Sequence, residues 1–528
     1  MINVIIERAR IYDGIDRAPF VTDLAIGGDR IALLGDLSGR EAYERIDAAN
    51  RTLAPGFIDV HSHSDELWLA DGSCRSKIRQ GVTTEIAGNC GTSVAPLRGE
   101  AELRKAEEAR AVGVELAWRE LDQFFDIVER SGVALNVASL VGLGTTRRAV
   151  CGEREGRLED DELAAQCALV RDTVERGALG VSSGLIYTPS RFADERELVA
   201  CASAAREAGM PRYATHLRSE GDDLLAAVDE ALAVARRADC AVQFSHHKAA
   251  GKKNWGKVHR SLDTIARARA RGVVANADVY PYVAMWTDLE TILPEDARRG
   301  GREATLERLR DPEAALALAL RLQLEREDEW HDIQISTLES ERNAALAGRR
   351  LDDIARSWRL SPPRAALRLL VEERLNVEAI FFAMTEEDVA TIVSADFVSI
   401  GSDASARSEV GPTARGLPHP RTFGTFPRVF GRYVRGRRTL ELGEAIRRMT
   451  SLAADQFGIA DRGRIVPGAF ADLVLFDAET IVDTATYERP YSYPLGIDFV
   501  WVNGRAVVRD GETTGDRPGR ALRGGRAR

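Results

Sequence analysis

Two histidines that follow a short apolar run have the residue type and spacing for metal chemistry. His61 and His63 lie two positions apart in the segment PGFIDVHSH, which begins at Pro55. Because successive strand side chains alternate between faces, both imidazoles point the same way at the end of the predicted strand 56–61. Placed there, they can contact one metal ion. Two histidines at this spacing also occur without a metal, so the positions of the other histidines are needed to support a metal site.

The chain has only eight histidines, and five of them lie at or just past predicted strand ends. Besides the first two, these are His216, His246 and His247, at the ends of the predicted strands 213–216 and 242–246. Catalytic residues of a β/α barrel gather at the carboxyl ends of its strands. His247 faces the opposite way from its neighbour, and we expect it to pack against the core or to support a ligand.

A cysteine and an aspartate extend this group of candidate ligands. Cys90 follows the predicted strand 83–87, and Asp403 follows the predicted strand 397–402. A lone cysteine is most often a small core residue, but at the same edge as four imidazoles we interpret it as a ligand. A thiolate favours Zn²⁺ over Mg²⁺ or Mn²⁺. Asp403 can bind a metal and accept a proton from water, with a helix N-cap as its structural alternative.

Eight predicted strands must position these side chains. They are 56–61, 83–87, 134–141, 180–183, 213–216, 242–246, 273–278 and 397–402. Helical periodicity separates them, and this alternation predicts an α/β fold with a closed, TIM-like (β/α)8 barrel. About 118 residues separate the last two strands. That length exceeds one crossover helix, so we expect an insertion at about 284–349, lying over the strand ends as a lid.

Both ends of the chain are β-like rather than helical. Residues 1–54 and 456–513 contain short apolar runs separated by glycine turns, and together they predict one small β-sandwich domain. The barrel domain then covers residues 55–455. Residues 514–528 are rich in arginine and glycine, and we expect a flexible tail.

The composition limits the possible partners. The chain has 528 residues, of which 44% are hydrophobic, which excludes a fibrous or disordered protein. A net charge of −10 leaves no broad basic surface, so we expect no nucleic-acid partner. Six cysteines without a CxxC pair favour a reducing cytoplasm, and no apolar run reaches the ~18 residues of a membrane span. The expected location is cytoplasmic, and the oligomeric state stays open.

Together, these motifs resemble the N-acyl-D-amino-acid deacylases (D-aminoacylases) of the amidohydrolase superfamily. The motifs occur in order along nearly the whole chain: PGFIDVHSH, GNCG, GLIYTPS, ATHLRSEGD, FSHHKAAG, DVYPY, the late SD and HPRTFGTFPRV. The cysteine after the second strand, combined with His-His-Lys after the sixth, is the most specific part. The resemblance implies a barrel with a β-sandwich from both chain ends, an insertion before the eighth strand, and zinc-dependent hydrolysis of N-acyl-D-amino acids.

The resemblance also implies two neighbouring metal positions. A tightly held Zn²⁺ has one sulfur and two imidazole ligands, which are Cys90, His216 and His246. A second, weaker position is formed by His61, His63 and Asp403. Many related hydrolases bridge two metals through a carboxylated lysine after the fourth strand, but residues 177–187 contain no lysine. Cys90 is then the implied bridge.

The same resemblance implies roles in catalysis and substrate binding. Zn²⁺ lowers the pKa of bound water toward ~7 and polarises the amide carbonyl. Asp403 is the implied general acid/base. Arg421 matches the arginine that binds the substrate carboxylate through its planar fork. The positions that line the same pocket are Lys248, Tyr187 and Tyr280. The structural alternatives are a surface charge for Lys248, barrel packing for the tyrosines and an ion pair for Arg421.

The sequence departs from the family pattern at three places. Leu143 stands where many relatives have a histidine, Ala404 follows Asp403 where glycine is usual, and fifteen residues separate Asp403 from His419. Acyl and side-chain preferences therefore stay open, as does the choice between D and L substrates. One alternative function is another amide hydrolase, acting on an N-acyl-D-glutamate or aspartate, a cyclic amide or an N-acyl amine. The other is a catalytically silent scaffold.

Overall fold

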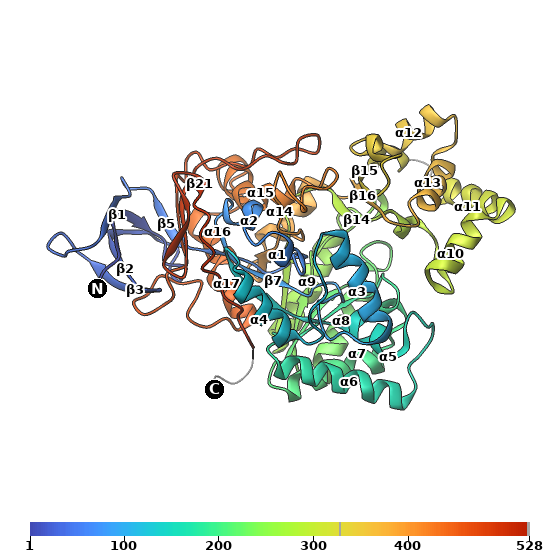
Figure 1. Ribbon diagram of the computed structural model, residues 1–528, viewed down its shortest axis with the longest axis horizontal. Coiled ribbons are helices and arrows are strands. Elements are labelled where there is room, and N and C mark those ends of the chain that lie inside the picture. The colour runs from blue at the N-terminus through green and yellow to red at the C-terminus, as the bar shows by residue number, and fades with distance from the viewer. Residues whose placement is uncertain (327–328, 525–528) are drawn as a thin grey trace.

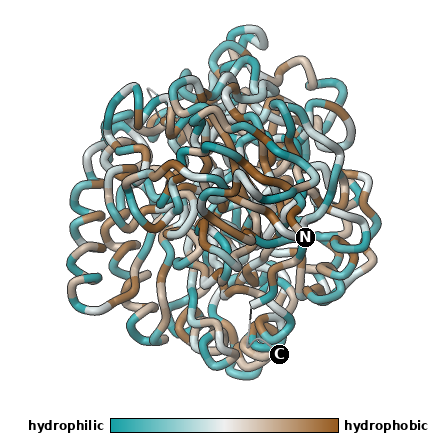
Figure 2. Tube along the Cα trace, turned by 90° about the vertical axis from the view of Figure 1, so that its left-hand side faces the viewer, coloured by the Kyte–Doolittle hydropathy of each residue, from teal (hydrophilic) through white to brown (hydrophobic). Residues whose placement is uncertain are grey.

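The computed structural model describes residues 1–326 and 329–524 and has three visible parts (Figure 1). Strands from both chain ends lie together at one side, helices and parallel strands fill the middle, and a smaller helical part with β14–β16 lies at the far side. Hydrophobic segments concentrate in the interior (Figure 2). The fold is mixed α/β, as predicted.

The middle part contains two parallel sheets. The first comprises β6 (Phe57–Asp59), β7 (Val82–Ala87) and β8 (Asn136–Ser139). The second has the order β17-β13-β12-β11-β10-β9, with bounds Val398–Ile400, Ala275–Val279, Ala241–Phe244, Arg212–His216, Val181–Gly184 and Val141–Gly142. Leu140 alone separates β8 from β9, and a parallel bridge joins Ser62 to Ala404. The two sheets are therefore linked along both edges.

Helices lie between most of these strands along the chain. They are α1 (Leu67–Ala70), α2 (Arg75–Ile78), α3 (Gly99–Ala111), α4 (Leu121–Ser131), α5 (Leu143–Cys151), α6 (Asp160–Glu175), α7 (Glu195–Glu207), α8 (Leu224–Ala238), α9 (Lys257–Ala270), α14 (Glu386–Ser394), α15 (Arg421–Arg428), α16 (Leu442–Met449) and α17 (Ser451–Phe457). In α6, Leu163, Val170 and Val174 recur at helical spacing and are buried, while Glu159 and Glu162 form a capping box at its start.

The two chain ends share one nine-stranded sheet. Its strands are β1 (Val4–Ile11), β2 (Phe20–Gly27), β3 (Arg30–Gly35), β4 (Glu44–Asp47), β5 (Thr52–Pro55), β18 (Leu473–Phe476), β19 (Ile497–Val502), β20 (Arg505–Arg509) and β21 (Glu512–Thr513). The pairing of β5 with β18 joins the two halves. One face packs into a core that includes Ile6, Leu24, Leu473 and Trp501. The other face is buried as well, since Val474 and Val500 belong to the core of the middle part and Ile5 and Ala25 to a small separate core.

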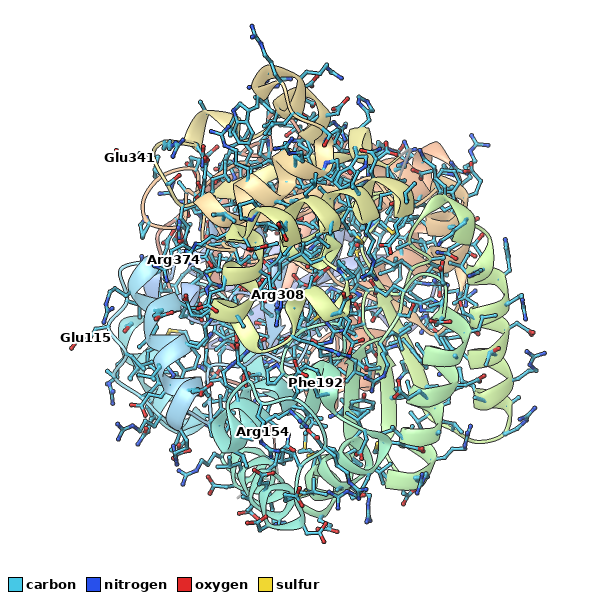
Figure 3. The ribbon with its side chains drawn as sticks, turned by 90° about the vertical axis from the view of Figure 1, so that its right-hand side faces the viewer. Glu115, Arg154, Phe192, Arg308, Glu341 and Arg374 are labelled. Atoms are coloured by element: carbon cyan, nitrogen blue, oxygen red, sulfur yellow. The ribbon has the colours of Figure 1, made fainter. Side chains whose placement is uncertain are left out.

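The segment before β17 has a sheet and a core of its own. Its strands are β14 (Met285–Asp288), β15 (Ile333–Leu338) and β16 (Val377–Phe381), and its α-helices are α10 (Gly301–Arg310), α11 (Pro312–Glu325), α12 (Leu351–Trp358) and α13 (Pro362–Glu372). It extends beyond the expected range 284–349 because Ile354, Leu369 and Val377 share its core. In Figure 3, these yellow helices, with Arg308 labelled, lie above the blue-green and green helices.

The last described residues are held against the molecule. The backbone N–H groups of Gly519 and Leu522 donate to the carbonyl oxygens of Val133 and Val137, at 2.8 and 2.7 Å. The expectation of a flexible tail is therefore wrong for residues 514–524, because backbone pairing holds them in place. The rest of that range lies outside the described residues. None of the helices in the described part of the chain is both long enough and apolar enough to span a membrane.

Asp472 joins the terminal sheet to the parallel strands. Its Oδ1 accepts a hydrogen bond from the Asn503 backbone at 2.7 Å, and its Oδ2 accepts one from Asn136 Nδ2 at 3.0 Å. Arg462 also donates to Oδ2, and both partners of this ion pair are buried. Asp472→Ala leaves a buried guanidinium unpaired, so we expect the free energy of unfolding to fall by about 3–5 kcal/mol.

Denaturant unfolding measures this loss. Asp229→Ala, an exposed change on α8, is the control and is expected to stay within ~0.5 kcal/mol of wild type. Equal stabilities of the two variants would contradict the assigned role of Asp472.

Candidate metal centre

The candidate ligands come together where five parallel strands end. His61 follows β6, Cys90 follows β7, His216 ends β11, His246 follows β12 and Asp403 follows β17. At Cys90, His246 and Asp403 the backbone φ is 51°, 36° and 50°. This left-handed region is unfavourable for residues other than glycine, and such conformations cluster at functional sites.

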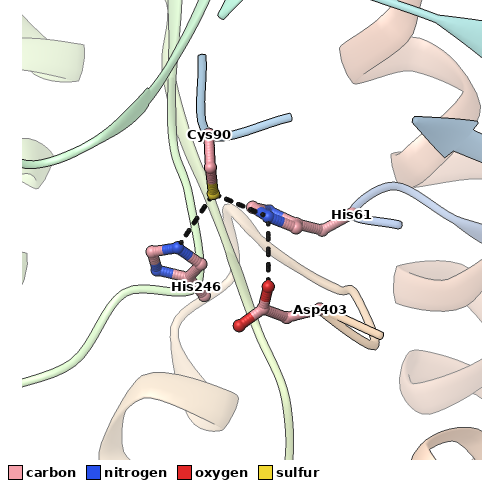
Figure 4. Close-up of side chains that lie close together, drawn as sticks. All are labelled: His61, Cys90, His246 and Asp403. Carbon is pink, nitrogen blue, oxygen red and sulfur yellow. Dashed lines mark hydrogen bonds and ion pairs between the residues drawn. The ribbon is translucent and has the colours of Figure 1, made fainter. Parts of the chain in front are cut away.

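Four of these side chains form a close group (Figure 4). Cys90 Sγ lies 3.3 Å from the Nε2 atoms of both His61 and His246, and His61 Nε2 lies 3.4 Å from Asp403 Oδ1. Tetrahedral zinc with bonds of ~2.3 Å to sulfur and ~2.05 Å to nitrogen places these two ligand atoms roughly 3.6 Å apart. The observed separations therefore suit ligands of one ion.

His216 shows most clearly that a group is required at this position. Its ring is buried and lies 4.4 Å from the His246 ring, measured between centroids. Neither ring nitrogen makes a hydrogen bond to the described residues, and Nε2 lies 3.6 Å from Glu220 Oε2. Buried polar atoms are nearly always partnered. A metal ion bound by sulfur and imidazole would supply the missing partner.

The charges at the site favour the deprotonated forms of Cys90 and Asp403. Burial raises the pKa of the Cys90 thiol, but the charges of His61 and His246 outweigh it and hold the pKa well below its ordinary value. Burial also raises the pKa of the Asp403 carboxyl, while the charges of Arg421 and His246 hold it well below its usual range. These charges favour the anionic forms of the sulfur and the carboxylate, which are the forms that bind a metal.

Two further carboxylates fix the orientation of the imidazoles. Asp278 on β13 has Oδ1 3.1 Å from His61 Nδ1, and the same oxygen accepts the backbone N–H of His246 at 2.8 Å. Glu220 has Oε1 3.0 Å from His246 Nδ1 and 2.5 Å from Lys248 Nζ. Carboxylates on the outer nitrogens set the tautomer and basicity of ligand histidines. Sequence reasoning missed Asp278, and its position on a strand beside a ligand strand is the signal that points to it.

An open cavity of about 1090 Å³ lies over this centre. Its lining includes all four residues predicted to bind substrate, which are Tyr187, Lys248, Tyr280 and Arg421, together with His63, Cys90, His216, His246 and Asp403. Arg421 is buried, and its Nη2 lies 3.0 Å from Asp403 Oδ2. Its Nε and Nη1 have no hydrogen-bond partner in the described part of the chain. Two unpartnered donors beside a cavity are suited to an incoming carboxylate.

The remaining pocket residues have contacts with clear structural roles. The Tyr187 ring packs edge-on against His216 at 5.2 Å, and its hydroxyl lies 3.0 Å from Thr287 Oγ1. His63 Nε2 lies 3.1 Å from Asp403 Oδ1. The Lys248 ammonium lies 5.7 Å from the Tyr280 ring centre, close enough for a cation–π interaction.

Other sequence candidates lie outside the ligand group. His247 Nε2 lies 2.8 Å from Ser261 Oγ, and burial lowers its pKa to about 4, which agrees with a packing role. His419 Nδ1 accepts the backbone N–H of Arg421 at 3.0 Å, so it supports that arginine. Leu143 is buried at the start of α5 and does not line the cavity.

Comparisons with known proteins show the family to which this chain belongs. A family model described as "Amidohydrolase family" matches residues 44–508. N-acyl-D-glutamate deacylase from Alcaligenes xylosoxydans xylosoxydans is 37% identical over 99% of this chain and 96% of the relative. The crystal structure of N-acyl-D-glutamate deacylase from Bordetella bronchiseptica, complexed with zinc and a phosphonate inhibitor, has a TM-score of 0.84 and 34% identity. That match covers 99% of this chain and 100% of the other.

A D-aminoacylase structure reported for its binuclear metal centre also has a TM-score of 0.84, with 33% identity over 99% of this chain and 100% of the other. The chain therefore belongs to the amidohydrolase family and is a metal-dependent amide hydrolase. Within that family it is a member of the N-acyl-D-amino-acid deacylases, or D-aminoacylases, which confirms the resemblance found in the motifs.

The sulfur ligand is the most direct target for a metal-binding test. We expect Cys90→Ala to weaken zinc binding by more than about 100-fold, because the change removes the sulfur that contacts the imidazoles of both His61 and His246. Cys201→Ala changes another buried cysteine, on α7, and serves as the control with unaltered zinc content. Elemental analysis of the purified proteins measures both. A Cys90→Ala protein with full zinc content would refute the ligand role.

Proposed function

We propose that this chain hydrolyses the amide bond of N-acyl-D-amino acids, releasing a carboxylate and a free D-amino acid. One observation carries the proposal: the Asp403 carboxylate lies between an imidazole–thiolate cluster and a buried arginine with unpartnered donors. Such an arrangement places a proton acceptor between a metal position and a carboxylate-binding group. Two relatives are named N-acyl-D-glutamate deacylase and D-aminoacylase, and these names support the same reaction.

The proposed metal is Zn²⁺, in two unequal positions. Its tight ligands are Cys90, His216 and His246, and the weaker position has His61, His63 and Asp403. When bound, zinc lowers the pKa of a water molecule and polarises an amide carbonyl. The 3.3 Å contact between Cys90 Sγ and His61 Nε2 supports two neighbouring positions, because it joins one residue from each proposed ligand set. The zinc and the binuclear centre named for the related structures support this assignment.

Asp403 is the proposed general acid/base. Its carboxylate is ionised, because the neighbouring charges hold its pKa well below the usual range. It accepts a proton from the attacking water and returns that proton to the nitrogen of the departing amine. The return step matters because an amine leaves poorly as an anion. Where the weaker metal position is not filled, His61 or His63 can stabilise the negative charge that develops on the carbonyl oxygen.

The substrate is held by its free carboxylate. Arg421 supplies a rigid, buried guanidinium whose face packs on the Tyr280 ring at 4.4 Å. Its unpartnered Nε–H and Nη1–H groups can each donate a hydrogen bond to a carboxylate oxygen. Lys248 adds a second positive charge, which Glu220 holds at 2.5 Å. Tyr187 and Tyr280 line the same cavity. The partner in solution is a small molecule.

The proposal includes the domain architecture of the chain. The two parallel sheets, linked along both edges, form an eight-stranded (β/α)8 barrel covering about residues 55–455. The ranges 1–54 and 456–513 form the accompanying β-sandwich. The segment that carries β14–β16 is a lid, since Trp286 and Phe381 line the cavity over the metal centre. The proposed location is the cytoplasm, where the thiolate ligand stays reduced.

A second candidate is an acidic N-acyl-D-amino acid such as N-acyl-D-glutamate. Arg298 and Arg302 line the same cavity, and Arg298 Nε is buried without a hydrogen-bond partner among the described residues. These cations can receive a side-chain carboxylate. The relatives named for N-acyl-D-glutamate support this candidate.

Paired kinetics on enzyme of measured zinc content test the proposal. We expect N-acetyl-D-methionine or N-acetyl-D-glutamate to be hydrolysed and the matching L enantiomers to react at least about 100-fold more slowly. With the carboxylate and the amide both held in place, inversion at the α-carbon directs the side chain to the opposite side of the cavity. Arg421→Ala is expected to lower kcat/KM by about 10–100-fold through loss of a charge-assisted bond. The preferred D side chain distinguishes the two candidates.

Arg342→Ala, an exposed arginine on the inserted segment, is the matched control and should leave kcat/KM unchanged. The proposal fails if a zinc-loaded enzyme prefers the L enantiomers. It also fails if Arg421→Ala and Arg342→Ala have the same activity.

A further inference from the structure

Lys77 is a fully buried ammonium close to the candidate metal centre and outside the cavity lining. It lies on α2, and its Nζ is 2.7 Å from Asp59 Oδ2 on β6 and 2.9 Å from Glu85 Oε1 on β7. Burial lowers the pKa of the lysine, but the two carboxylates raise it above the ordinary value, so the group is charged. A buried charge is costly unless it is fully paired, and this one is held in a defined place.

The same ammonium also contacts both neighbours of Asp403. Lys77 Nζ donates to Ser402 Oγ at 2.7 Å and to the carbonyl oxygen of Ala404 at 2.8 Å. Ser402 Oγ in turn accepts the backbone N–H of Ala404 at 3.1 Å. Asp59 Oδ1 accepts the backbone N–H of Ser402 at 2.8 Å. The residues before and after Asp403 are therefore fixed by one buried ion pair.

Asp403 needs such support, because its own backbone is strained. Its φ of 50° lies in the left-handed region, which a non-glycine residue keeps only when its surroundings determine the conformation. In this conformation Oδ1 lies 3.1 Å from His63 Nε2, and Oδ2 lies 3.0 Å from Arg421 Nη2. A relaxed backbone would redirect the carboxylate away from these partners.

The second carboxylate of the cluster anchors the histidine segment in the same way. Glu85 Oε1 accepts hydrogen bonds from Ser62 Oγ at 2.7 Å and Ser64 Oγ at 2.9 Å, on either side of His63. Ser64 Oγ accepts the backbone N–H of Ala406 at 2.7 Å. One buried cluster thus sets the relative positions of the segment with His63 and the segment with Asp403.

We propose that Lys77 is a positioning residue for the reaction: by bonding to Ser402 and Ala404, it holds Asp403 in the conformation that faces the reacting groups. The inference rests on the proposed function, in which Asp403 moves the proton. It predicts that loss of the ammonium affects turnover more than substrate binding, because Lys77 lies outside the cavity that binds the substrate carboxylate.

Three variants test this role. Lys77→Met removes the charge and keeps the length of the side chain. Ser402→Ala removes only the hydroxyl that links Lys77 to the backbone. If Lys77→Met does not fold, Ser402→Ala tests the positioning role in its place. Lys105→Met is the matched control, because Lys105 is also buried and paired with two carboxylates. These belong to Glu66, at the N-terminus of α1, and Glu108, on α3.

We measure circular dichroism, zinc per chain, kcat and KM, with kcat expressed per bound zinc. The expected result is a loss in kcat of about tenfold or more for Lys77→Met, since small misplacements of a catalytic group are costly. Ser402→Ala should show a smaller loss, with KM nearly unchanged in both. Lys105→Met should keep wild-type kcat. A crystal structure of Lys77→Met should show the Asp403 carboxylate displaced from His63.

The inference is overturned if folded Lys77→Met and Ser402→Ala match Lys105→Met in kcat per bound zinc. It is also overturned if Asp403 keeps its position and left-handed backbone in the Lys77→Met structure. An inactive wild-type enzyme contradicts the proposed function, and the crystal structure of Lys77→Met then tests the inference alone.

Discussion

The structure depends on keeping a thiol, several imidazoles and a carboxylate together inside a protein at the ends of parallel strands. Each of these groups loses water on burial, and an unpartnered buried polar group destabilises a fold. Here the groups partner one another: the Cys90 sulfur contacts two imidazoles, and Asp403 contacts His61, His63 and Arg421. Among the imidazoles of the centre in the described residues, His216 is the one whose two ring nitrogens both lack a hydrogen bond, and a cation at the centre would supply a partner.

A further layer of charge makes this arrangement specific. Asp278 and Glu220 contact the outer nitrogens of the imidazoles. Lys77 bonds to the turn that carries Asp403, and its partner Glu85 bonds to the turn that carries His63. At Cys90, His246 and Asp403 the backbone adopts the left-handed conformation, which residues other than glycine disfavour, so the packing of the site overrides the local backbone preference. The surrounding parallel sheets are rigid enough to sustain this strain, because almost every strand residue in them is buried.

The local parts of this structure could be predicted from the sequence. The two-residue spacing predicted that His61 and His63 lie close together, as their ring separation of 5.4 Å shows, although both residues lie beyond the end of β6. The order of apolar runs predicted that Cys90, His246 and Asp403 lie at strand ends. Motifs identified the family, which the comparisons confirm. Long-range pairing could not be predicted in this way. The bonds of Asp278 and Lys77 join residues from separate strands and helices, and the packing of residues 514–524 depends on strand edges far away in the sequence.

The measurement that tests the central claim most directly is X-ray absorption at the zinc edge of the purified protein. The account predicts one sulfur neighbour at about 2.3 Å together with nitrogen and oxygen neighbours at about 2.0–2.1 Å. A zinc spectrum that contains only nitrogen and oxygen neighbours, with no sulfur, would contradict the account.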